Sequence, residues 1–134
     1  MRYMMLIYGK EVEGGVAPED REAVMSGHEA VINEATRKGV LRGAEPLAPT
    51  STATTVRMQD GKPLITDGPF AETKEQLAGY YIMDCENLDE AIEWAAKIPT
   101  RCKGTQGCIE IRPMPGLPVR SQEALAGQAV APNG

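Results

Sequence analysis

The sequence predicts an α+β domain in which two helices cover one face of an antiparallel sheet. Two segments, Arg2–Tyr8 and Gly79–Cys85, are apolar at successive positions, which is typical of central strands covered on both faces. Two other segments, Pro18–Lys38 and Leu88–Ile98, place apolar residues at helical spacing. A turn signal over residues 59–62 marks a hairpin between the two halves. The 134 residues fit one domain.

The first half of the chain begins with a strand and a helix. Arg2–Tyr8 contains the aromatic and long apolar residues that favour a strand. Pro18–Lys38 has a proline in its first turn, acidic residues near its start and basic residues before Gly39, as helices commonly do. Its apolar stripe is expected to face the sheet, and consists of Val24, His28, Val31, Ile32 and Ala35.

The middle of the chain holds shorter strands. Val40–Leu47 is a weak strand, which Pro46 places at an edge of the sheet or ends early. Thr52–Met58 and Pro63–Thr66 are the two strands of the hairpin, and the second strand runs into a turn at Asp67. We therefore expect the hairpin to be inserted between two β-α-β units.

The second half repeats the order of strand, helix and strand. In Gly79–Cys85, Tyr81 and Met83 point to one face, and Tyr80 and Ile82 point to the other. The next helix is expected to start at an Asn87 cap, to end at Ile98, and to bury the stripe Leu88, Ala91, Ile92, Ala95 and Ile98, with Trp94 at its border. Thr105–Arg112 alternates as an edge strand does and is ended by Pro113.

This order of elements predicts a ferredoxin-like plait formed by residues 1–115, followed by a loose tail over residues 116–134. Both helices of such a plait cover one face of the sheet. The other face keeps Met, Tyr and Ile side chains, and nothing in the chain is left to cover them. We therefore expect a homodimer joined through the helix-free sheet face.

The composition limits the partners and the compartment. The formal net charge is −5 and the chain has no cluster of Lys and Arg, so neither nucleic acid nor an anionic membrane is an expected partner. No apolar run is long enough for a transmembrane helix, and no secretory signal is recognised. The three cysteines, Cys85, Cys102 and Cys108, form no C-x-x-C pair, which indicates reduced thiols in the cytoplasm and no metal site.

The stretch from Thr66 to Tyr81 carries the most specific signal in the chain. Asp67-Gly68-Pro69 is a rigid turn that holds a carboxylate at a strand end, and the only Phe of the chain, Phe70, follows as its apolar anchor. The run DGPFAETKEQLAGYY resembles the signature of DGPF-domain proteins, within the YCII-related family. The resemblance covers roughly residues 1–114. It implies a ferredoxin-like domain that pairs into a dimeric α/β-barrel-like assembly and whose activity is mostly unassigned.

The only histidine of the chain, His28, is the leading catalytic candidate, because its side chain can take and give a proton near neutral pH. The resemblance implies a helix histidine near an acidic residue, which in this chain would be Asp67. The family's arginine close before that histidine has no clear match here, since Arg21 lies seven positions earlier. The alternative interpretation is a core histidine bonded to the backbone.

Three further residues are candidates for ligand contacts. Arg112 could hold a carboxylate or phosphate, or pair with an acid on the sheet surface. Tyr81 and Phe70 could contact a small molecule at a cleft, or could serve packing alone. No nucleotide-binding, serine-hydrolase or zinc-protease motif is present, so no cofactor is expected.

Two functions fit these observations. The first is a cofactor-free enzyme that uses the His28–Asp67 pair for acid–base chemistry on a small polar molecule. The second is a non-catalytic binding or regulatory protein. The resemblance implies such a role as an accessory partner of an extracytoplasmic-function sigma factor.

Overall fold

The computed structural model describes residues 1–100 and 107–117. The predicted tail, apart from its first residues, and Cys102 lie outside the described residues. In chain order the elements are β1 (Arg2–Gly9), α1 (Pro18–Arg37), β2 (Leu41–Pro46), a short 3₁₀ helix η1 (Thr50–Thr52), β3 (Thr54–Gln59), β4 (Lys62–Asp67), β5 (Gln76–Asp84), α2 (Leu88–Ala95) and β6 (Gly107–Met114).

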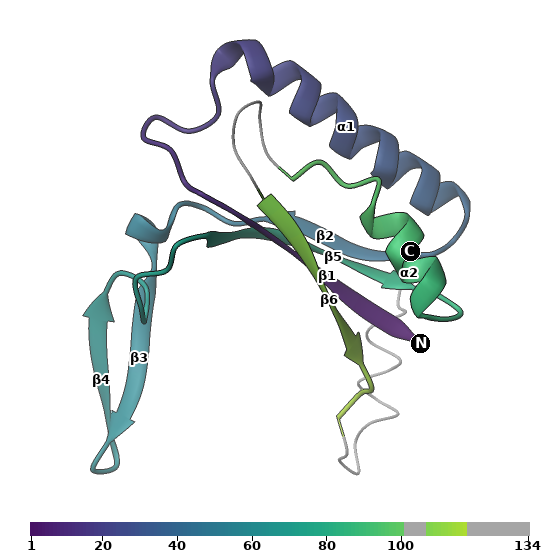
Figure 1. Cartoon of the computed structure of the whole chain (residues 1–134). Coiled ribbons are helices and arrows are strands. Elements are labelled where there is room, and N and C mark those ends of the chain that lie inside the picture. The colour runs from purple at the N-terminus through teal and green to yellow at the C-terminus, as the bar shows by residue number, and fades with distance from the viewer. Residues whose placement is uncertain (101–106, 118–134) are drawn as a thin grey trace.

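Four strands form the main sheet, in the order β2-β5-β1-β6, and every neighbouring pair is antiparallel. Helices α1 and α2 lie on the same face of this sheet (Figure 1). The prediction of an α+β fold with two helices on one face of an antiparallel sheet is confirmed, and the strand order is compatible with a ferredoxin-like plait. The two most apolar strands, β1 and β5, are central as predicted.

The core lies between the sheet and the two helices. Along β1 the burial alternates, so that Met5 has no exposed surface while its neighbours Met4 and Leu6 are partly exposed on the other face. The same alternation along β5 buries Tyr81 and Met83. From α1, Val31 and Ala35 of the predicted stripe complete this layer.

The buried face of helix α2 is shifted from the predicted one: Ala91, Ala95 and Ile98 are buried as predicted, but Trp94 at the border is buried as well and Leu88 and Ile92 are not. Trp94 is only 4% exposed, whereas Leu88 and Ile92 are 51% and 48% exposed. The buried side is Ala91, Trp94, Ala95 and Ile98, which also has helical spacing. We attribute the difference to size, since the small Ala91 and Ala95 let this short helix lie close to the sheet and so enclose the large indole between them.

Strand β6 also differs from its prediction, because it continues through Pro113 to Met114. Pro113 stands opposite Tyr3 of β1. The strand is an edge strand of the sheet, where a proline is tolerated because its missing N–H can lie on the unpaired side.

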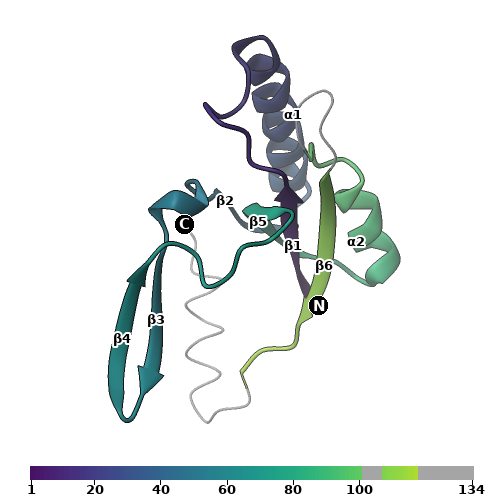
Figure 2. The same ribbon diagram turned by 60° about the vertical axis from the view of Figure 1, so that its left-hand side comes forward.

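The hairpin of β3 and β4 forms a separate two-stranded sheet. It projects from the main sheet on the side opposite the helices, as both views show (Figures 1 and 2). Phe70, which follows the hairpin, is 72% exposed. The prediction that Phe70 is the apolar anchor of the Asp67 turn is therefore wrong for the described chain: the turn belongs to a projecting arm, and no described core residue lies beside it for the ring to pack against.

Candidate functional site

A cavity of about 360 Å³ lies between α1 and the sheet. Its walls come from α1, from the central strands, from the end of β2, and from the chain on either side of the helices. Most of its lining side chains are apolar. The lining residues are Ile7, Val16, Val24, Met25, His28, Ile32, Ala44, Glu45, Pro46, Ala78, Gly79, Tyr80, Tyr81, Pro99 and Thr100.

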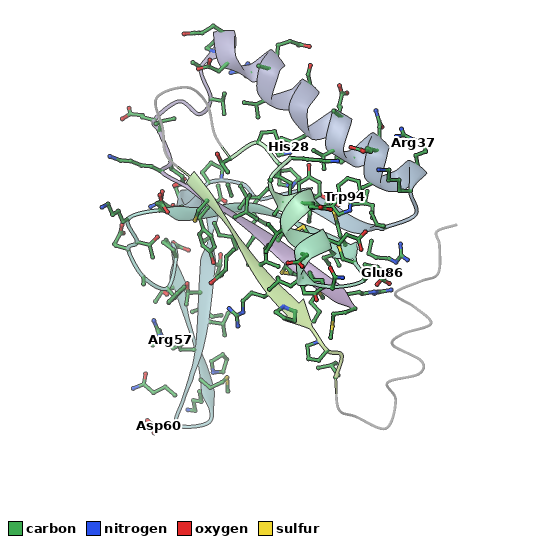
Figure 3. The ribbon with its side chains drawn as sticks, turned by 45° about the vertical axis from the view of Figure 1, so that its right-hand side comes forward. His28, Arg37, Arg57, Asp60, Glu86 and Trp94 are labelled. Atoms are coloured by element: carbon green, nitrogen blue, oxygen red, sulfur yellow. The ribbon has the colours of Figure 1, made fainter. Side chains whose placement is uncertain are left out.

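The polar centre of this cavity is a pair formed by His28 and Tyr81. His28 lies on the side of α1 that faces the sheet (Figure 3). Its Nδ1 lies 2.7 Å from the Tyr81 hydroxyl oxygen, which is a strong hydrogen bond. The two rings are stacked, with centroids 5.9 Å apart and an angle of 21° between their planes. Tyr81 therefore fixes both the position and the tilt of the imidazole.

Burial changes the proton affinity of both side chains. Removal of His28 from water lowers its pKa below the ordinary value of 6.5, because the charged imidazolium loses solvation. Burial raises the pKa of Tyr81 to about 12 for the corresponding reason, since the phenolate would be the charged form. At neutral pH the pair therefore consists of a neutral imidazole and a protonated phenol.

Two glycines let the walls of the cavity approach closely. A Cβ atom on Gly27 of α1 would lie 2.6 Å from Cγ of Pro99, so only a glycine allows α1 to lie against the segment after α2. A Cβ atom on Gly79 of β5 would lie 2.8 Å from the carbonyl oxygen of Glu45. The sequence thus places glycines where a side chain would push α1 or β2 away from the cavity.

The predicted site residues are divided between different parts of the molecule. His28 and Tyr81 meet in the cavity. Asp67 is an exposed residue at the end of β4, and neither it nor Phe70 lines the cavity. Arg112 is exposed on β6, opposite Met4, whose side chain belongs to the helix-free face. The described chain thus gives His28 a different partner from the predicted Asp67, and a catalytic role for Asp67 stays a prediction.

The pairing of His28 with Tyr81 was missed, although the sequence held a signal for it. His28 belongs to the stripe of α1 that faces the sheet, and Tyr81 shares its strand face with the core residue Met83. Two polar groups thus point into the same apolar layer, where each needs a hydrogen-bond partner. That requirement favours contact between them.

Other kinds of site find little support in the part of the chain that the structure describes. Within it, no cluster of three or more His, Cys, Asp or Glu side chains could hold a metal ion. Cys85 is buried, and burial together with Glu90 and Asp84 raises the pKa of its thiol to about 11, so it is a poor nucleophile. No described helix has both the length and the apolar character needed to cross a bilayer.

Comparison with known proteins identifies one family. The family model described as the YCII-related domain matches residues 1–115. A protein of Rhizobium meliloti (strain 1021), named only as uncharacterized, is 40% identical to this chain over 115 residues. That alignment covers 85% of this chain and 92% of the relative. The relative carries no named activity that could be compared with the cavity.

Proposed function

The chain belongs to the YCII-related domain family, and we propose that it is an enzyme in which His28 moves a proton on a small molecule bound between α1 and the sheet. The observation that carries this proposal is the contact of 2.7 Å between His28 Nδ1 and the Tyr81 hydroxyl in the wall of a cavity of about 360 Å³. A positioned imidazole beside an apolar cavity is the arrangement that general acid–base catalysis requires.

The chemistry follows from the two ring nitrogens. Tyr81 occupies Nδ1, and no other hydrogen bond of His28 is found within residues 1–100 and 107–117. Nε2 is therefore the atom that exchanges a proton with the bound molecule. When Nε2 takes a proton from a C–H or O–H group, Nδ1–H donates to the Tyr81 oxygen and keeps the ring in place. While it is held on Nε2 the proton exchanges with solvent, and return of a proton from Nε2 to another atom of the molecule completes an isomerisation and leaves the protein unchanged.

The lining of the cavity defines the class of molecule. Apolar side chains such as Val24, Ile32 and Pro99 form most of its surface. Among the described lining residues only His28 could carry a positive charge, and because its pKa is lowered it is uncharged at neutral pH and does not hold an anion. An ionised ligand would lose its hydration there without a favourable interaction to offset that loss. We therefore favour a neutral, largely apolar molecule with one hydroxyl or carbonyl group over the small polar molecule expected from the sequence.

Ligand-observed NMR with a library of neutral ring compounds, each bearing one hydroxyl or carbonyl group, tests this proposal. The variant Val24→Trp fills the cavity from α1, and Ala30→Trp places the same side chain on the exposed face of that helix. We expect Val24→Trp to abolish binding and Ala30→Trp to retain it. Equal binding to both variants, or no binding to the wild type, would contradict the proposed site.

A second measurement separates catalysis from binding alone. His28→Ala removes one hydrogen bond to the ligand, so the affinity should fall about tenfold, which corresponds to about 1.4 kcal/mol. Solvent deuterium exchange into the bound compound should cease completely in this variant. If exchange is absent from the wild type as well, the cavity serves a non-catalytic binding protein. A role beside a sigma factor stays a prediction, since none of the described residues tests it.

A further inference from the structure

The hairpin of β3 and β4 is joined to the main sheet by two stretches of chain (Figures 1 and 2). The first connection, residues 47–53, follows β2 and contains η1. The second connection, residues 68–75, leads from β4 to β5. It carries the residues GPFAETKE of the DGPF signature, none of which lines the cavity. The angle between the hairpin and the main sheet is therefore set at these two connections.

Both connections are tied to one residue, Glu11, on the loop between β1 and α1. Its side chain accepts two hydrogen bonds from Thr50 of η1: the backbone nitrogen of Thr50 lies 2.8 Å from Oε2, and its hydroxyl oxygen lies 2.7 Å from Oε1. The backbone N–H of Glu11 donates to Oε1 of Gln76 at 2.8 Å. Nε2 of Gln76 in turn donates to the carbonyl oxygen of Thr73, in the second connection, at 2.6 Å. We call this set of contacts the Glu11 clamp.

The Glu11 clamp has the composition of a strong and specific contact. Both carboxylate oxygens of Glu11 accept a hydrogen bond, and bonds to a charged acceptor are about twice as strong as bonds between neutral groups. Glu11, Thr50 and Gln76 are each partly buried, so water competes for these bonds less than on an open surface. Thr50 and Gln76 lie 39 and 65 positions from Glu11 in the chain. The clamp is therefore a tertiary contact and not a local turn.

The root of the hairpin is bonded to η1 as one unit. The backbone N–H of Gly68 donates to the carbonyl oxygen of Ala53, which directly follows η1, at 2.7 Å. The hydroxyl of Thr55 donates to the carbonyl oxygen of Gly68 at 2.8 Å. Gly68 has a φ of +95°, which a glycine adopts without strain. A residue that holds η1 therefore also holds the hairpin.

Each of the three segments that the clamp joins leads into the wall of the cavity. The wall residues are Val16, Pro46 and Ala78. Val16 lies on the same loop as Glu11, Pro46 ends β2 just before the first connection, and Ala78 lies near the start of β5. The backbone N–H of Leu47 donates to the carbonyl oxygen of Ala78 at 2.8 Å, which joins the first connection to β5. Movement at the root of the hairpin is thus transmitted to the cavity wall.

We propose that the Glu11 clamp couples the orientation of the hairpin to the shape of the cavity, and in this way regulates the ligand site of the proposed function. In the closed state Glu11 holds Thr50, and Val16 and Pro46 stand together in the cavity wall. In the open state water bonds to the Thr50 donors, the hairpin turns about its two connections, and Val16 and Pro46 separate. A ligand that contacts both wall residues binds the closed state more tightly, and by linkage it holds the hairpin in place. The regulation rests on the proposed function, whereas the coupling does not.

NMR of the ligand-free full chain tests the clamp with two variants of similar side-chain length. Glu11→Met removes both acceptors, whereas the side chain in Glu11→Gln accepts from the Thr50 N–H and donates to the Thr50 hydroxyl. Exchange of the Thr50 amide proton should accelerate at least about tenfold in Glu11→Met. The methyl resonances of Val24 and Ile32 on α1 should shift in the same variant. Glu11→Gln should resemble the wild type in both respects.

Two further variants guard this test against a general loss of structure. Thr50→Val removes only the hydroxyl contact, so it should produce smaller shifts in the same direction as Glu11→Met. Arg57 donates to the carbonyl oxygen of Phe70 at 3.2 Å and so joins β3 to the second connection outside the clamp. Arg57→Met should leave the Val24 resonances unchanged. Thr50 exchange at the wild-type rate in Glu11→Met would overturn the clamp, and faster exchange without a shift of the Val24 methyl groups would overturn the coupling.

The coupling is also tested from the cavity, again without a ligand. Val24→Trp fills the cavity and presses on Val16 and Pro46, so exchange of the Thr50 amide should accelerate at least about fivefold. Ala30→Trp, on the exposed face of α1, should leave that rate unchanged. Equal Thr50 exchange in the two variants would contradict the proposal. Because neither measurement uses a ligand or an activity, a failure of the coupling is distinguished from a failure of the proposed function.

Discussion

The body of the domain, which is the main sheet with its two helices, buries its large apolar side chains. The hairpin of β3 and β4 leaves side chains of the same kinds exposed. Met5 and Met83 in the main sheet have no exposed surface, whereas Met58 in the hairpin is 68% exposed. The body has two helices to bury its apolar residues, whereas no described helix covers the hairpin (Figure 1). The comparison teaches that the described chain completes its core and its cavity, while it leaves the apolar side chains of the hairpin exposed.

The largest expected difference comes from one substitution made in both regions. Met83→Ala removes a fully buried side chain and should lower the free energy of unfolding by about 2–5 kcal/mol. Met58→Ala should cost less than about 0.5 kcal/mol in the monomer, because the side chain is exposed. Denaturant unfolding followed by circular dichroism, at a concentration where the chain is monomeric, measures both. Equal costs would remove the distinction between body and hairpin.

Alanine at two glycines gives the next largest contrast. In Gly79→Ala the new Cβ meets the backbone oxygen of Glu45 at 2.8 Å, so β2 must move and the unfolding free energy should fall by about 1–3 kcal/mol. In the hairpin turn, Gly61 has a φ of +77° and open space around it. Gly61→Ala should cost about 1 kcal/mol through backbone strain alone. Amide exchange along β2 should accelerate only in Gly79→Ala.

A third pair of variants compares the two faces of β5. Tyr81→Phe removes the hydroxyl that holds His28 and should destabilise the chain by about 1 kcal/mol. Tyr80→Phe removes the same atom on the helix-free face, where no hydrogen bond of the hydroxyl is found among the described residues, and should stay within about 0.5 kcal/mol of the wild type. If the order of these costs is reversed, the His28–Tyr81 contact is not a stabilising one.

The pH dependence of stability is expected to come from the same histidine. The pKa of folded His28 lies below the ordinary value of 6.5, so the unfolded chain binds the proton more tightly. The contribution of neutral His28 is complete above pH 6.5 and is lost as the pH falls from there toward the folded pKa. Denaturant unfolding between pH 8 and 5 should therefore show a loss that His28→Gln reduces. An identical profile in the variant would show that His28 is not desolvated.

The smallest effect is expected at Asp67. It is exposed at the end of β4, and no ion pair or hydrogen bond of its side chain is found within the described residues. Asp67→Asn should leave the unfolding free energy of the monomer within about 0.5 kcal/mol of the wild type. A larger loss under those conditions would assign Asp67 a structural role that the hairpin geometry does not provide.

The sequence predicted the body better than the hairpin for a physical reason. The doubly apolar strands at Met5 and Met83 and the stripe through Val31 report burial inside one chain, and such patterns determine which strands are central. The hairpin turn at Asp60 was recognised from local chemistry alone. How far the hairpin projects depends on the tertiary arrangement, and local patterns do not encode it. The buried face of α2 was predicted only in part, because the apolar pattern alone does not decide whether Trp94 or Leu88 faces the sheet.

The candidate site could be predicted only in part. His28 was found because it is the only histidine and lies in an apolar stripe. Its partner Tyr81 is separated from it by 53 positions in the chain, and the choice between Tyr81 and Asp67 depends on which strand crosses below α1. Strand order across a sheet is a long-range property that local patterns do not encode. The turn residue Asp67 was therefore chosen as the partner of His28 in place of Tyr81 of β5.

The most direct test of the account is the NMR titration of the His28 ring in the wild type, in Tyr81→Phe and in Asp67→Asn. The structure predicts a pKa below 6.5 in the wild type, ring nitrogen shifts that change in Tyr81→Phe, and no change in Asp67→Asn. A raised pKa that falls in Asp67→Asn would contradict the account and would establish Asp67 as the partner of the histidine.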